Sequence, residues 1–586
     1  MDEVEAARSS TIFGAKASLD LRLEAADTHA RAVFTCTDGV LSTGGMFNGS
    51  SAVQDAILAA APAPQGATIL VRTGTYIIDT ALNVTYPIRL VGVDATVVVT
   101  NNVAAGYMLT LGASSDDSRI ENISFQKGTG TDRLIDLITS HRTRLQNLVI
   151  TNGSVSLTSG NQIRLQQVNI TNHSSATDEA LWVGNVNKCQ VDQCRFICTS
   201  PSVSGVYLSS TAQIKFSQCH FDSLNDVTAL ETATGTKHVI LDVCWFVCQP
   251  FTADKPVAIL NLAKGTLKDL VFEVNGASTI TTSFLSITGV NYTVDGVMCD
   301  LSIGSNLFYF GADNNPLQFI TSRLATVRNV NLIGGTIPTV GNNGFSLSAL
   351  EPLVRITPTD EAELVFENSV IKEQAYAGVP SGYTELTLLG GRSTVTDPVG
   401  SGIQRVRNVD LSFIDGYSTG STIFVNLLTA LQPGSKVTEC HFKWGIITNA
   451  IGHYTTSGSS HALMINNCTF DSALANKTFR VIYANSPIIV SDCSFNVNGI
   501  DMTTSALRGI YVSSGAPSIF CQNRVYQYNT VDPTSQYLLV VMGNYCTTFN
   551  NSIKCGHANY LPYSLAGAGN IPSLVNFTTY NAVQTP

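Results

Sequence analysis

The residues with the clearest potential for chemistry recur at a near-constant interval in the first half of the chain. Asp136, Ser156, Trp182, Tyr207 and Glu231 follow one another at spacings of 20 to 26 residues. Apolar residues flank several of them, and alternation along a β-strand turns those neighbours inward and this set outward. The sequence therefore predicts an outward column of acidic, hydroxyl and aromatic side chains.

Two aromatic residues suggest what this outward column could bind. Trp182 and Tyr207 are expected one rung apart, where they would form a flat apolar platform with polar tips that suits stacking against a sugar ring. Tyr511 is expected in the same phase farther along the chain. With the acids Asp136 and Glu231, the two rings are the predicted glycan-binding residues. Burial of the rings by a loop or by a second copy of the chain is the alternative interpretation.

The acids of the column do not have the spacing of a hydrolytic pair. Glycoside hydrolysis needs two carboxyl groups about 5–9.5 Å apart, whereas Asp136 and Glu231 are expected four rungs, or roughly 19 Å, apart. Asp226 and Asp254 fall in loops on neighbouring rungs, and with Glu231 they are the remaining catalytic candidates. Loop carboxylates are, however, usually only solvated.

Other reaction classes find little support in the sequence. The outward column holds no Lys or Arg that could take a proton in a lyase reaction. Zinc-ligand spacings, nucleotide-binding loops and nucleophile elbows are also absent from the sequence. We therefore expect no metal and no cofactor.

A repeated strand must position this column. Between residues 188 and 249 the triplets Cys-Arg-Phe, Cys-His-Phe and Cys-Trp-Phe recur every 25 residues, and a fixed period of this length is typical of a solenoid. The last position of the triplet defines a core slot of mostly large apolar residues that continues in both directions. The core slot is predicted at Phe125, Ile150, Ile170, Phe196, Phe221, Phe246, Phe272, Leu301, Leu332, Ile371, Leu411, Phe442, Phe470, Phe495, Val525 and Ile553.

Length and composition are compatible with one long solenoid. Each turn of a solenoid contacts only its neighbours, so a chain of 586 residues can form a single domain. No apolar run is long enough for a membrane helix. A net charge of −10 without a basic cluster argues against nucleic acid and anionic membrane as partners. The opening residues lack a signal-peptide pattern, which predicts synthesis in a cytoplasm without export.

Cysteines often stand two positions before the core slot. In that position Cys acts as a small hydrophobe in a stack, and a cytoplasmic assembly route keeps thiols reduced. Six cysteines are therefore predicted to be buried free thiols: Cys194, Cys219, Cys244, Cys440, Cys468 and Cys493.

Helical patterns occur only near the N-terminus. Residues 1–32 are charged and amphipathic and are expected to form a short helical segment. A second helix is predicted over 50–61, where Ser51 and Gln54 match a capping box and Val53, Ile57 and Leu58 share one face. This second helix would cover the open end of the first coil.

Two short patterns resemble known families. The sequence from Val4 to Leu23 resembles the "V-x-x-A-R…G…L-x-x-R-L" element that precedes β-helices in bacteriophage tail fibres and tailspikes. The predicted helix at 50–61, the Gly74-Thr75-Tyr76 strand and the following "L-x-G" strand resemble the start of the pectate-lyase-like superfamily, although Arg72 and Thr73 stand where proline is common. The resemblance implies an all-β fold, a right-handed parallel β-helix with a short N-terminal helical segment, and a homotrimer.

The predicted domain organisation follows from these assignments. Residues 1–32 would form an attachment segment and 33–118 the helix cap and first coils. Residues 119–560 would form the β-helix shaft, in which wider steps place long loops at about 333–410, and 561–586 would cap the last coil.

These observations predict a virion fibre or tailspike-like receptor-binding protein that attaches a bacteriophage to a host surface glycan. Its expected partners are two further copies of the chain, other virion tail or adaptor proteins bound through residues 1–32, and the host glycan. A tailspike depolymerase that hydrolyses the glycan is the first alternative. A cellular polysaccharide-degrading enzyme is the second, and the missing export signal and the fibre-like N-terminus disfavour it.

Overall fold

The computed structural model divides the chain into two compact units, residues 1–220 and 221–586. Residues 1–31 of the helical segment predicted at 1–32 lie outside the described residues, and Ala32 is the first residue of a strand. The structure describes residues 32–37, 47–61, 66–93, 96–172, 178–200, 203–224, 227–233, 236–248, 257–274, 279–280, 284–300, 307–308, 317–333, 336–337, 354–359, 362–373, 375–376, 385–390, 402–413, 424–429, 434–444, 449–453, 461–472, 480–484, 487–496, 508–512, 518–527, 536–541, 547–555, 560–565, 571–572 and 576–579.

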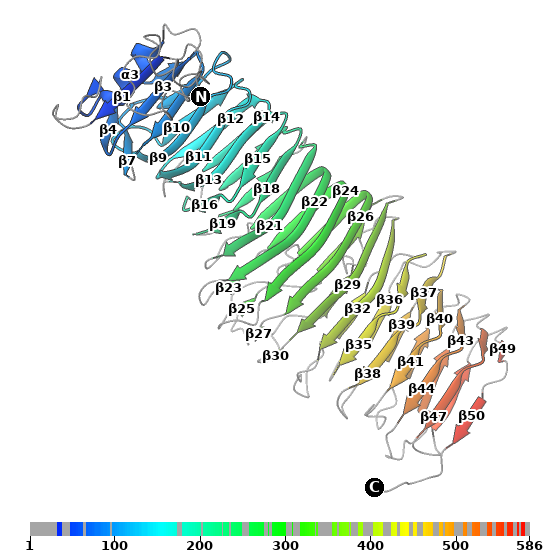
Figure 1. The fold of residues 1–586 in the computed structure, drawn as a ribbon. Helices are drawn as coiled ribbons and strands as arrows, with labels where there is room; N and C mark the ends of the chain where they lie inside the picture. Colours follow the sequence, from blue (N-terminus) through cyan, green and yellow to red (C-terminus); the bar gives the residue numbers. More distant parts are fainter. Residues whose placement is uncertain are drawn as a thin grey trace, which may run out of the picture. The chain divides into compact units, whose positions relative to one another are not determined.

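Each unit is a right-handed parallel β-helix, which confirms the predicted fold class. Successive coils place their strands side by side in parallel register (Figure 1). Three parallel sheets, here called sheets 1, 2 and 3 in the order in which the chain runs through them, make up the wall. Burial alternates along the strands, so every second side chain points into the core.

In the first unit several strands bend through sheets 1 and 2, while sheet 3 has strands of its own. Sheet 1 contains β1 (Ala32–Thr37), β2 (Phe47–Asn48), β3 (Ala67–Val71), β6 (Ile88–Gly92), β15 (Cys189–Asp192), β18 (Ile214–Ser217) and the first halves of β9 (Arg119–Lys127), β11 (Arg144–Thr151) and β13 (Ile163–Thr171). Sheet 2 contains β4 (Gly74–Ile78), β7 (Val97–Asn101), the second halves of β9, β11 and β13, and β16 (Arg195–Cys198). Sheet 3 contains β5 (Leu82–Val84), β8 (Leu109–Leu111), β10 (Arg133–Ile138), β12 (Ser154–Gly160), β14 (Leu181–Val186) and β17 (Val206–Ser209).

The second unit repeats this plan, and its longest strands run through all three sheets. Those strands are β22 (Ala258–Val274), β24 (Leu285–Asp300) and β26 (Leu317–Ile333). Sheets 1 and 2 also contain β19 (His220–Ser223), which begins at the unit boundary, β21 (His238–Cys248), β29 (Glu363–Glu373), β32 (Ile403–Phe413), β34 (Lys436–Thr438), β35 (His441–Trp444), β37 (Leu463–Asn466), β38 (Thr469–Ser472), β40 (Ile488–Ser491), β41 (Ser494–Asn496), β43 (Ile519–Cys521), β44 (Arg524–Gln527), β46 (Thr547–Phe549), β47 (Ser552–Cys555), β49 (Ile571–Pro572) and β50 (Asn576–Thr579). Sheet 3 also contains β20 (Leu230–Thr232), β28 (Val354–Pro358), β31 (Glu385–Gly390), β33 (Phe424–Thr429), β36 (Asn449–His453), β39 (Arg480–Ala484), β42 (Arg508–Val512), β45 (Gln536–Val541) and β48 (Tyr560–Leu565), and a separate small parallel sheet contains β23 (Thr279–Ile280), β25 (Leu307–Phe308), β27 (Thr336–Ile337) and β30 (Ala375–Tyr376).

A left-handed residue marks the corner between sheets 1 and 2 in coil after coil. It stands three positions before the core slot, as Asn122 (φ 59°) stands before Phe125. Asn is the commonest choice because it adopts this conformation more readily than most residues with a side chain. The corner amides also bond along the stack, and Asn147 Nδ2 donates to Asn122 Oδ1 at 2.8 Å. The corner positions are 122, 147, 167, 193 and 218 in the first unit and 243, 269, 296, 329, 368, 408, 439, 467, 492, 522 and 550 in the second.

The corner also settles the register of the core slot. The slot is confirmed at most predicted positions, but Phe272 pairs with Cys299, and Cys299 with Leu332. The predicted member Leu301 is therefore wrong, because Gly296 at the corner fixes the phase two residues earlier. Either residue fits the alternation, since both are apolar and two positions apart. The slot also extends beyond the predicted range, to Tyr76, Val99 and Phe577.

Aromatic rings in the core slot stack directly on one another. In the second unit the ring centroids of Phe246 and Phe272 lie 4.8 Å apart and those of Phe442 and Phe470 lie 4.7 Å apart, with nearly parallel planes. Such a pair contributes about 0.5–1.5 kcal/mol beyond the burial of its surface. The spacing of the rings is that of the rungs, so the register of the sheets sets the stacking.

The predicted state of the cysteines is confirmed. The eleven cysteines whose side chains are described are free and buried, and they include all six that the sequence singled out. Burial raises the pKa of the Cys36 thiol to about 12, and it also raises the pKa of Cys219. These thiols stay neutral because the interior disfavours the thiolate.

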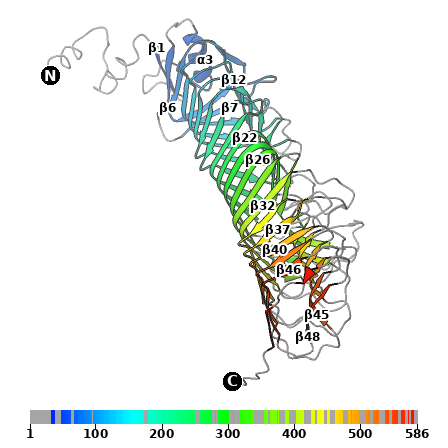
Figure 2. The same ribbon diagram turned by 90° about the vertical axis from the view of Figure 1, so that its right-hand side faces the viewer.

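The helix α3 (Ala52–Ala60) lies where predicted and packs against β1, β3 and β4 at the end of the first unit (Figures 1 and 2). Two details of the prediction are wrong. The capping box does not form, because Gln54 Oε1 instead accepts hydrogen bonds from the backbone amides of Asp79 and Thr80. Leu58 is 54% exposed, and small alanines take the inner face beside Val53.

The wide steps near the middle of the second unit are confirmed. Leu332 pairs with Ile371, and Ile371 pairs with Leu411, although 39 and 40 residues separate them. Most of the loops predicted at 333–410 lie outside the described residues. The domain boundaries drawn from the sequence remain predictions.

One corner residue is poorly suited to its backbone. Val243 has φ 55°, a value that a β-branched residue rarely adopts. We expect Val243→Asn to raise the free energy of unfolding by about 1 kcal/mol, because it removes this strain. Slower thermal inactivation at a fixed temperature is the measurement. Val149→Asn is the control, since Val149 is an exposed strand residue with ordinary φ. An equal gain in both variants would contradict the strain at Val243.

Candidate functional site

The predicted outward column is present on sheet 3 of the first unit. In-register pairs join Asp136 to Ser156, Ser156 to Trp182, and Trp182 to Tyr207. The apolar neighbours of these residues along the strands are buried, as alternation requires. The in-register neighbours that the sequence predicted on β10, β12, β14 and β17 are therefore present, although Asp136 and Ser156 are only 6% and 4% exposed. Their role in glycan binding stays a prediction.

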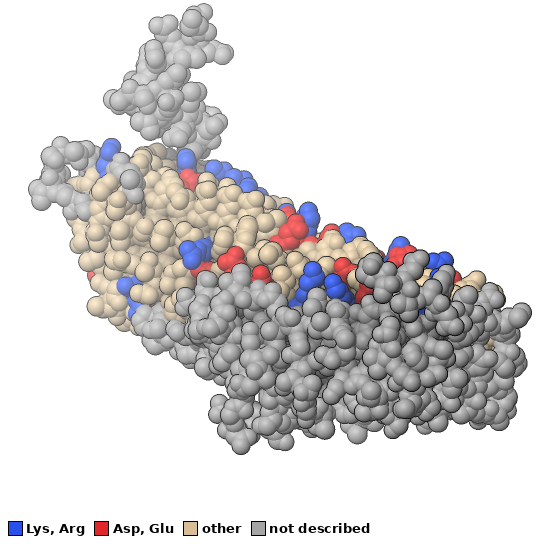
Figure 3. All heavy atoms as spheres, turned by 90° about the horizontal axis from the view of Figure 1, so that it is seen from below, with Lys and Arg blue, Asp and Glu red and all other residues tan. Residues whose placement is uncertain are grey.

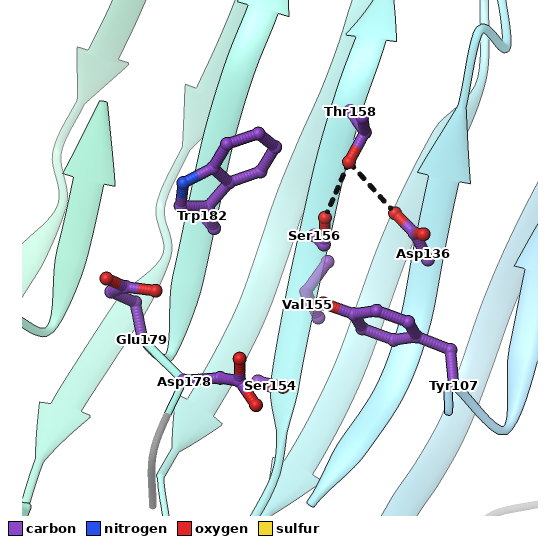
Figure 4. A pocket seen from close by; sticks show the side chains of 9 residues that line it. All are labelled: Tyr107, Asp136, Ser154, Val155, Ser156, Thr158, Asp178, Glu179 and Trp182. Atoms are coloured by element: carbon purple, nitrogen blue, oxygen red, sulfur yellow. Dashed lines mark hydrogen bonds between the residues drawn. The ribbon is translucent and has the colours of Figure 1, made fainter. Parts of the chain in front are cut away.

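A pocket of about 270 Å³ opens over this column (Figure 4). It joins three column residues to side chains from the loops that precede the strands. Its lining consists of Tyr107, Asp136, Ser154, Val155, Ser156, Thr158, Asp178, Glu179 and Trp182.

Asp136 is the most buried acid of the pocket, with 6% of its surface exposed. Its Oδ1 accepts a hydrogen bond from Thr158 Oγ1 at 3.3 Å, and Thr158 Oγ1 lies 2.9 Å from Ser156 Oγ (Figure 4). Burial raises the pKa of Asp136, and the bonds from Ser156 and Thr158 and the charge of Arg133 offset part of that rise. The site thus favours the neutral acid more than water does.

A second acid is held by an ion pair at the edge of the pocket. Arg133 donates from Nε to Asp178 Oδ2 at 2.8 Å and from Nη2 to Oδ1 at 3.2 Å. The guanidinium carbon of Arg133 also lies 5.8 Å from the centre of the Tyr107 ring, within the range of a cation–π contact. This two-point geometry fixes the direction of the Asp178 carboxylate. Glu179 follows it in sequence and adds a third acid to the lining.

Trp182 forms the aromatic wall of the pocket and lies across a glycine. A Cβ added at Gly184 would lie 2.1 Å from Cη2 of the indole ring, so the ring occupies the space that a side chain there would need. Tyr207 stands on the next rung and is half-buried. The platform of rings predicted from the sequence therefore begins in the pocket and continues on the neighbouring strand.

The arrangement has the chemical features of a site for a polyhydroxylated ligand. An aromatic face can stack on the apolar side of a sugar ring, while carboxylates and hydroxyls accept and donate the hydrogen bonds that its hydroxyl groups require. In a concave site of this kind, a small number of oriented polar groups fixes the orientation of a small ligand.

The other predicted site residues lie elsewhere or outside the described chain. Glu231 is in β20 of the second unit and is half-buried. Asp226 and Asp254 lie outside the described residues. The backbone of Tyr511 pairs with those of Tyr483 and Val540 on sheet 3 of the second unit. The assignment of these residues to a site therefore remains a prediction.

Four charged or aromatic residues that line or support the pocket were not predicted: Tyr107, Arg133, Asp178 and Glu179. The adjacent acids precede β14 directly, three and four positions before Trp182. The sequence did hold one signal for Asp178 and Glu179: they are adjacent acids just before the strand that carries Trp182. The strand register does not determine that they line the same pocket as Asp136, because both residues precede the strand.

Among the described residues no group of three or more His, Cys, Asp or Glu side chains is arranged to hold a metal ion. In the same part of the chain no helix is long and apolar enough to cross a membrane.

Comparison with known proteins gives only distant likenesses. No protein-family model matches the chain, and no curated protein matches it. Among solved structures, the tailspike protein of E. coli bacteriophage HK620 in complex with a pentasaccharide is 10% identical, with a TM-score of 0.27 over 96% of this chain and 87% of that chain. A mutant form of that tailspike, also with pentasaccharide, is 10% identical, with a TM-score of 0.32 over 97% and 85%. Likenesses this distant carry no inference about the site of this chain.

The buried acid gives the fold a dependence on pH. Since burial raises the folded-state pKa of Asp136 above its unfolded value of 3.8, its contribution to stability is complete below 3.8 and is lost as pH rises through the folded-state pKa. We expect Asp136→Asn to match the wild type at acidic pH and to become relatively more stable toward neutral pH. Thermal midpoints at a fixed scan rate across this range measure the effect.

Asp79→Asn is the control for this experiment, because Asp79 is an exposed acid at the turn after β4. A difference between Asp136→Asn and wild type that stays constant with pH, or one that Asp79→Asn reproduces, would contradict the assignment.

Proposed function

We propose that this chain is a bacteriophage fibre or tailspike-like protein that binds a host surface glycan through the pocket on sheet 3. The observation that carries the proposal is the column Asp136, Ser156, Trp182 and Tyr207, whose rings and acids share one face in register. A rigid solenoid wall holds these groups in place before a ligand arrives, which lowers the ordering cost of binding.

The wider biological role rests on the sequence. Resemblance of residues 4–23 to the element that precedes phage β-helices supports a virion location, with these residues contacting tail or adaptor proteins. The same resemblance supports a homotrimer. In this arrangement the wall of the β-helix binds the receptor, and the N-terminal residues attach the chain to the virion.

Glycan binding is tested by removing the aromatic wall in two independent ways. We expect Trp182→Ala to weaken binding to the recognised member of a panel of bacterial surface polysaccharides by about tenfold, because one stacking contact is lost. Gly184→Ala should weaken binding similarly, since the added methyl displaces the indole ring. Tyr207→Ala should reduce binding, and Glu231→Gln should have a modest effect. Surface plasmon resonance measures each affinity.

Gly112→Ala is the matched control, because a Cβ there would meet no atom closer than 3.6 Å. Unchanged glycan binding by both Trp182→Ala and Gly184→Ala, with folded protein, would remove the pocket from receptor recognition.

A depolymerase is the second candidate function, and the acids of the pocket favour it. Glycosidases use two carboxyl groups whose environments separate their pKa values. Asp136, with its raised pKa, shares the pocket with Asp178 and Glu179. In this role Asp136 would protonate the leaving oxygen as the acid, and one of the other two would act as base or nucleophile.

The two functions are separated by following reducing ends while the protein is incubated with the polysaccharide that it binds. A binding protein releases none above the background of Trp182→Ala. Steady release that Asp136→Asn or Glu179→Gln abolishes would establish hydrolysis in the pocket. If the release is instead abolished only by substitutions at Asp226, Glu231 or Asp254, hydrolysis takes place at the candidates drawn from the sequence.

A further inference from the structure

A column of arginines runs along sheet 1 of the first unit. In-register pairs join Arg89 to Arg119, Arg119 to Arg144, and Arg144 to Arg164. These residues are 20 to 30 positions apart in the sequence, so the fold alone gathers them on successive rungs about 4.8 Å apart. Figure 3 shows Lys and Arg side chains gathered in a run along one edge of the described surface.

Acidic neighbours compensate only the two ends of this arginine column. Arg89 pairs with Glu121 at 3.4 Å, and Arg164 pairs with Asp192 at 3.3 Å. Arg119 and Arg144, in the middle, are exposed, and no ion pair links either to an acid of the described residues. Like charges on facing strands destabilise a sheet. The column therefore carries a cost that its own surroundings do not offset.

The second unit shows the usual solution to the same problem. On its sheet 1 the charge alternates from rung to rung, and Arg328 pairs with Asp295 at 2.8 Å across two of them. The alternating ladder consists of Asp242, Lys268, Asp295, Arg328, Glu367 and Arg407. The stacking of like charges in the first unit thus differs from the alternating charges of the second unit.

The chemistry of the arginine column indicates the class of its ligand. Guanidinium groups bind carboxylates and phosphates through two parallel hydrogen bonds, and four of them in a line at even spacing fit an extended anionic polymer better than a compact anion. Gln146 and Gln166, two residues beyond Arg144 and Arg164 on the same face, offer amides to neighbouring hydroxyl groups. Aromatic residues, on which nucleic acid bases would stack, are absent from the column and from these flanking positions.

We propose that the arginine column is a second binding surface, which holds the acidic groups of a polysaccharide along sheet 1. The column lies on a different sheet from the pocket and uses charge where the pocket uses stacking. It therefore goes beyond the proposed function and can be tested apart from it.

The test measures binding of the full chain to immobilised polygalacturonate by surface plasmon resonance. Fully methyl-esterified polygalacturonate is the neutral competitor, and dextran sulfate is the competitor with a different anionic group. We expect the Arg119→Gln/Arg144→Gln double variant to lose about tenfold or more in affinity, because two charged hydrogen-bond donors to the acidic groups are removed. Its affinity should also depend less steeply on salt than that of the wild type. Arg119→Glu/Arg144→Glu should abolish binding.

Arg328→Gln/Arg407→Gln removes the same charge from the alternating ladder and should leave binding unchanged. Arg119→Gln/Arg144→Gln should cause the same fold-loss in affinity when it is introduced into Trp182→Ala, which separates this surface from the pocket. Three outcomes would overturn the proposal: no binding of wild type to polygalacturonate or dextran sulfate, equal competition by the methyl ester, or full binding by the Arg119→Gln/Arg144→Gln variant. Tighter binding of single-stranded DNA than of polygalacturonate would assign the column to nucleic acid and overturn it as well.

Discussion

The register between successive coils is the constraint on which the rest of this molecule depends. A slip of one residue would send every core side chain of a strand to the outer face. The left-handed corner residue fixes the strand register anew in each coil, so the lengths of the loops can vary without shifting the core side chains. This is why steps of 39 and 40 residues between Leu332 and Leu411 keep Ile371 in the core slot, with Asn368 and Asn408 at their corners.

The same register turns a one-dimensional repeat into chemical surfaces. Residues from four successive coils that share a phase become neighbours on one wall, whatever lies between them in the chain. On sheet 3 this produces the column from Asp136 to Tyr207, and on sheet 1 it produces the column from Arg89 to Arg164. Each surface is as rigid as the sheet that carries it, which suits recognition of long, repetitive ligands.

Opposite electrostatic solutions occur within the first unit. In the pocket, burial raises the pKa of Asp136 and Arg133 forms an ion pair with Asp178, so two of the three acids have part of their negative charge offset. On sheet 1 the positive charges of the exposed Arg119 and Arg144 are not offset by an ion pair with an acid of the described residues. Under the two proposals, a glycan that carries both apolar sugar faces and acidic groups would suit both surfaces.

The sequence by itself determined a solenoid of strands, most of the core slot and the register of the four column residues, because a period near 25 and alternation fix which residues share a phase. The right-handed parallel β-helix was implied by the resemblance to tailspikes and to the pectate-lyase-like superfamily. The sequence misplaced Leu301, since two apolar residues of equal parity compete and only the corner at Gly296 decides between them. Only the tertiary structure decided that Asp178 and Glu179 line the same pocket as Asp136, because strand periodicity does not determine where residues before a strand lie. The arginine column follows the register, since Arg119, Arg144 and Arg164 each stand six positions before the core slot. Only the structure decided that no acid of the described residues forms an ion pair with Arg119 or Arg144, because strand periodicity does not fix side-chain ion pairs between rungs.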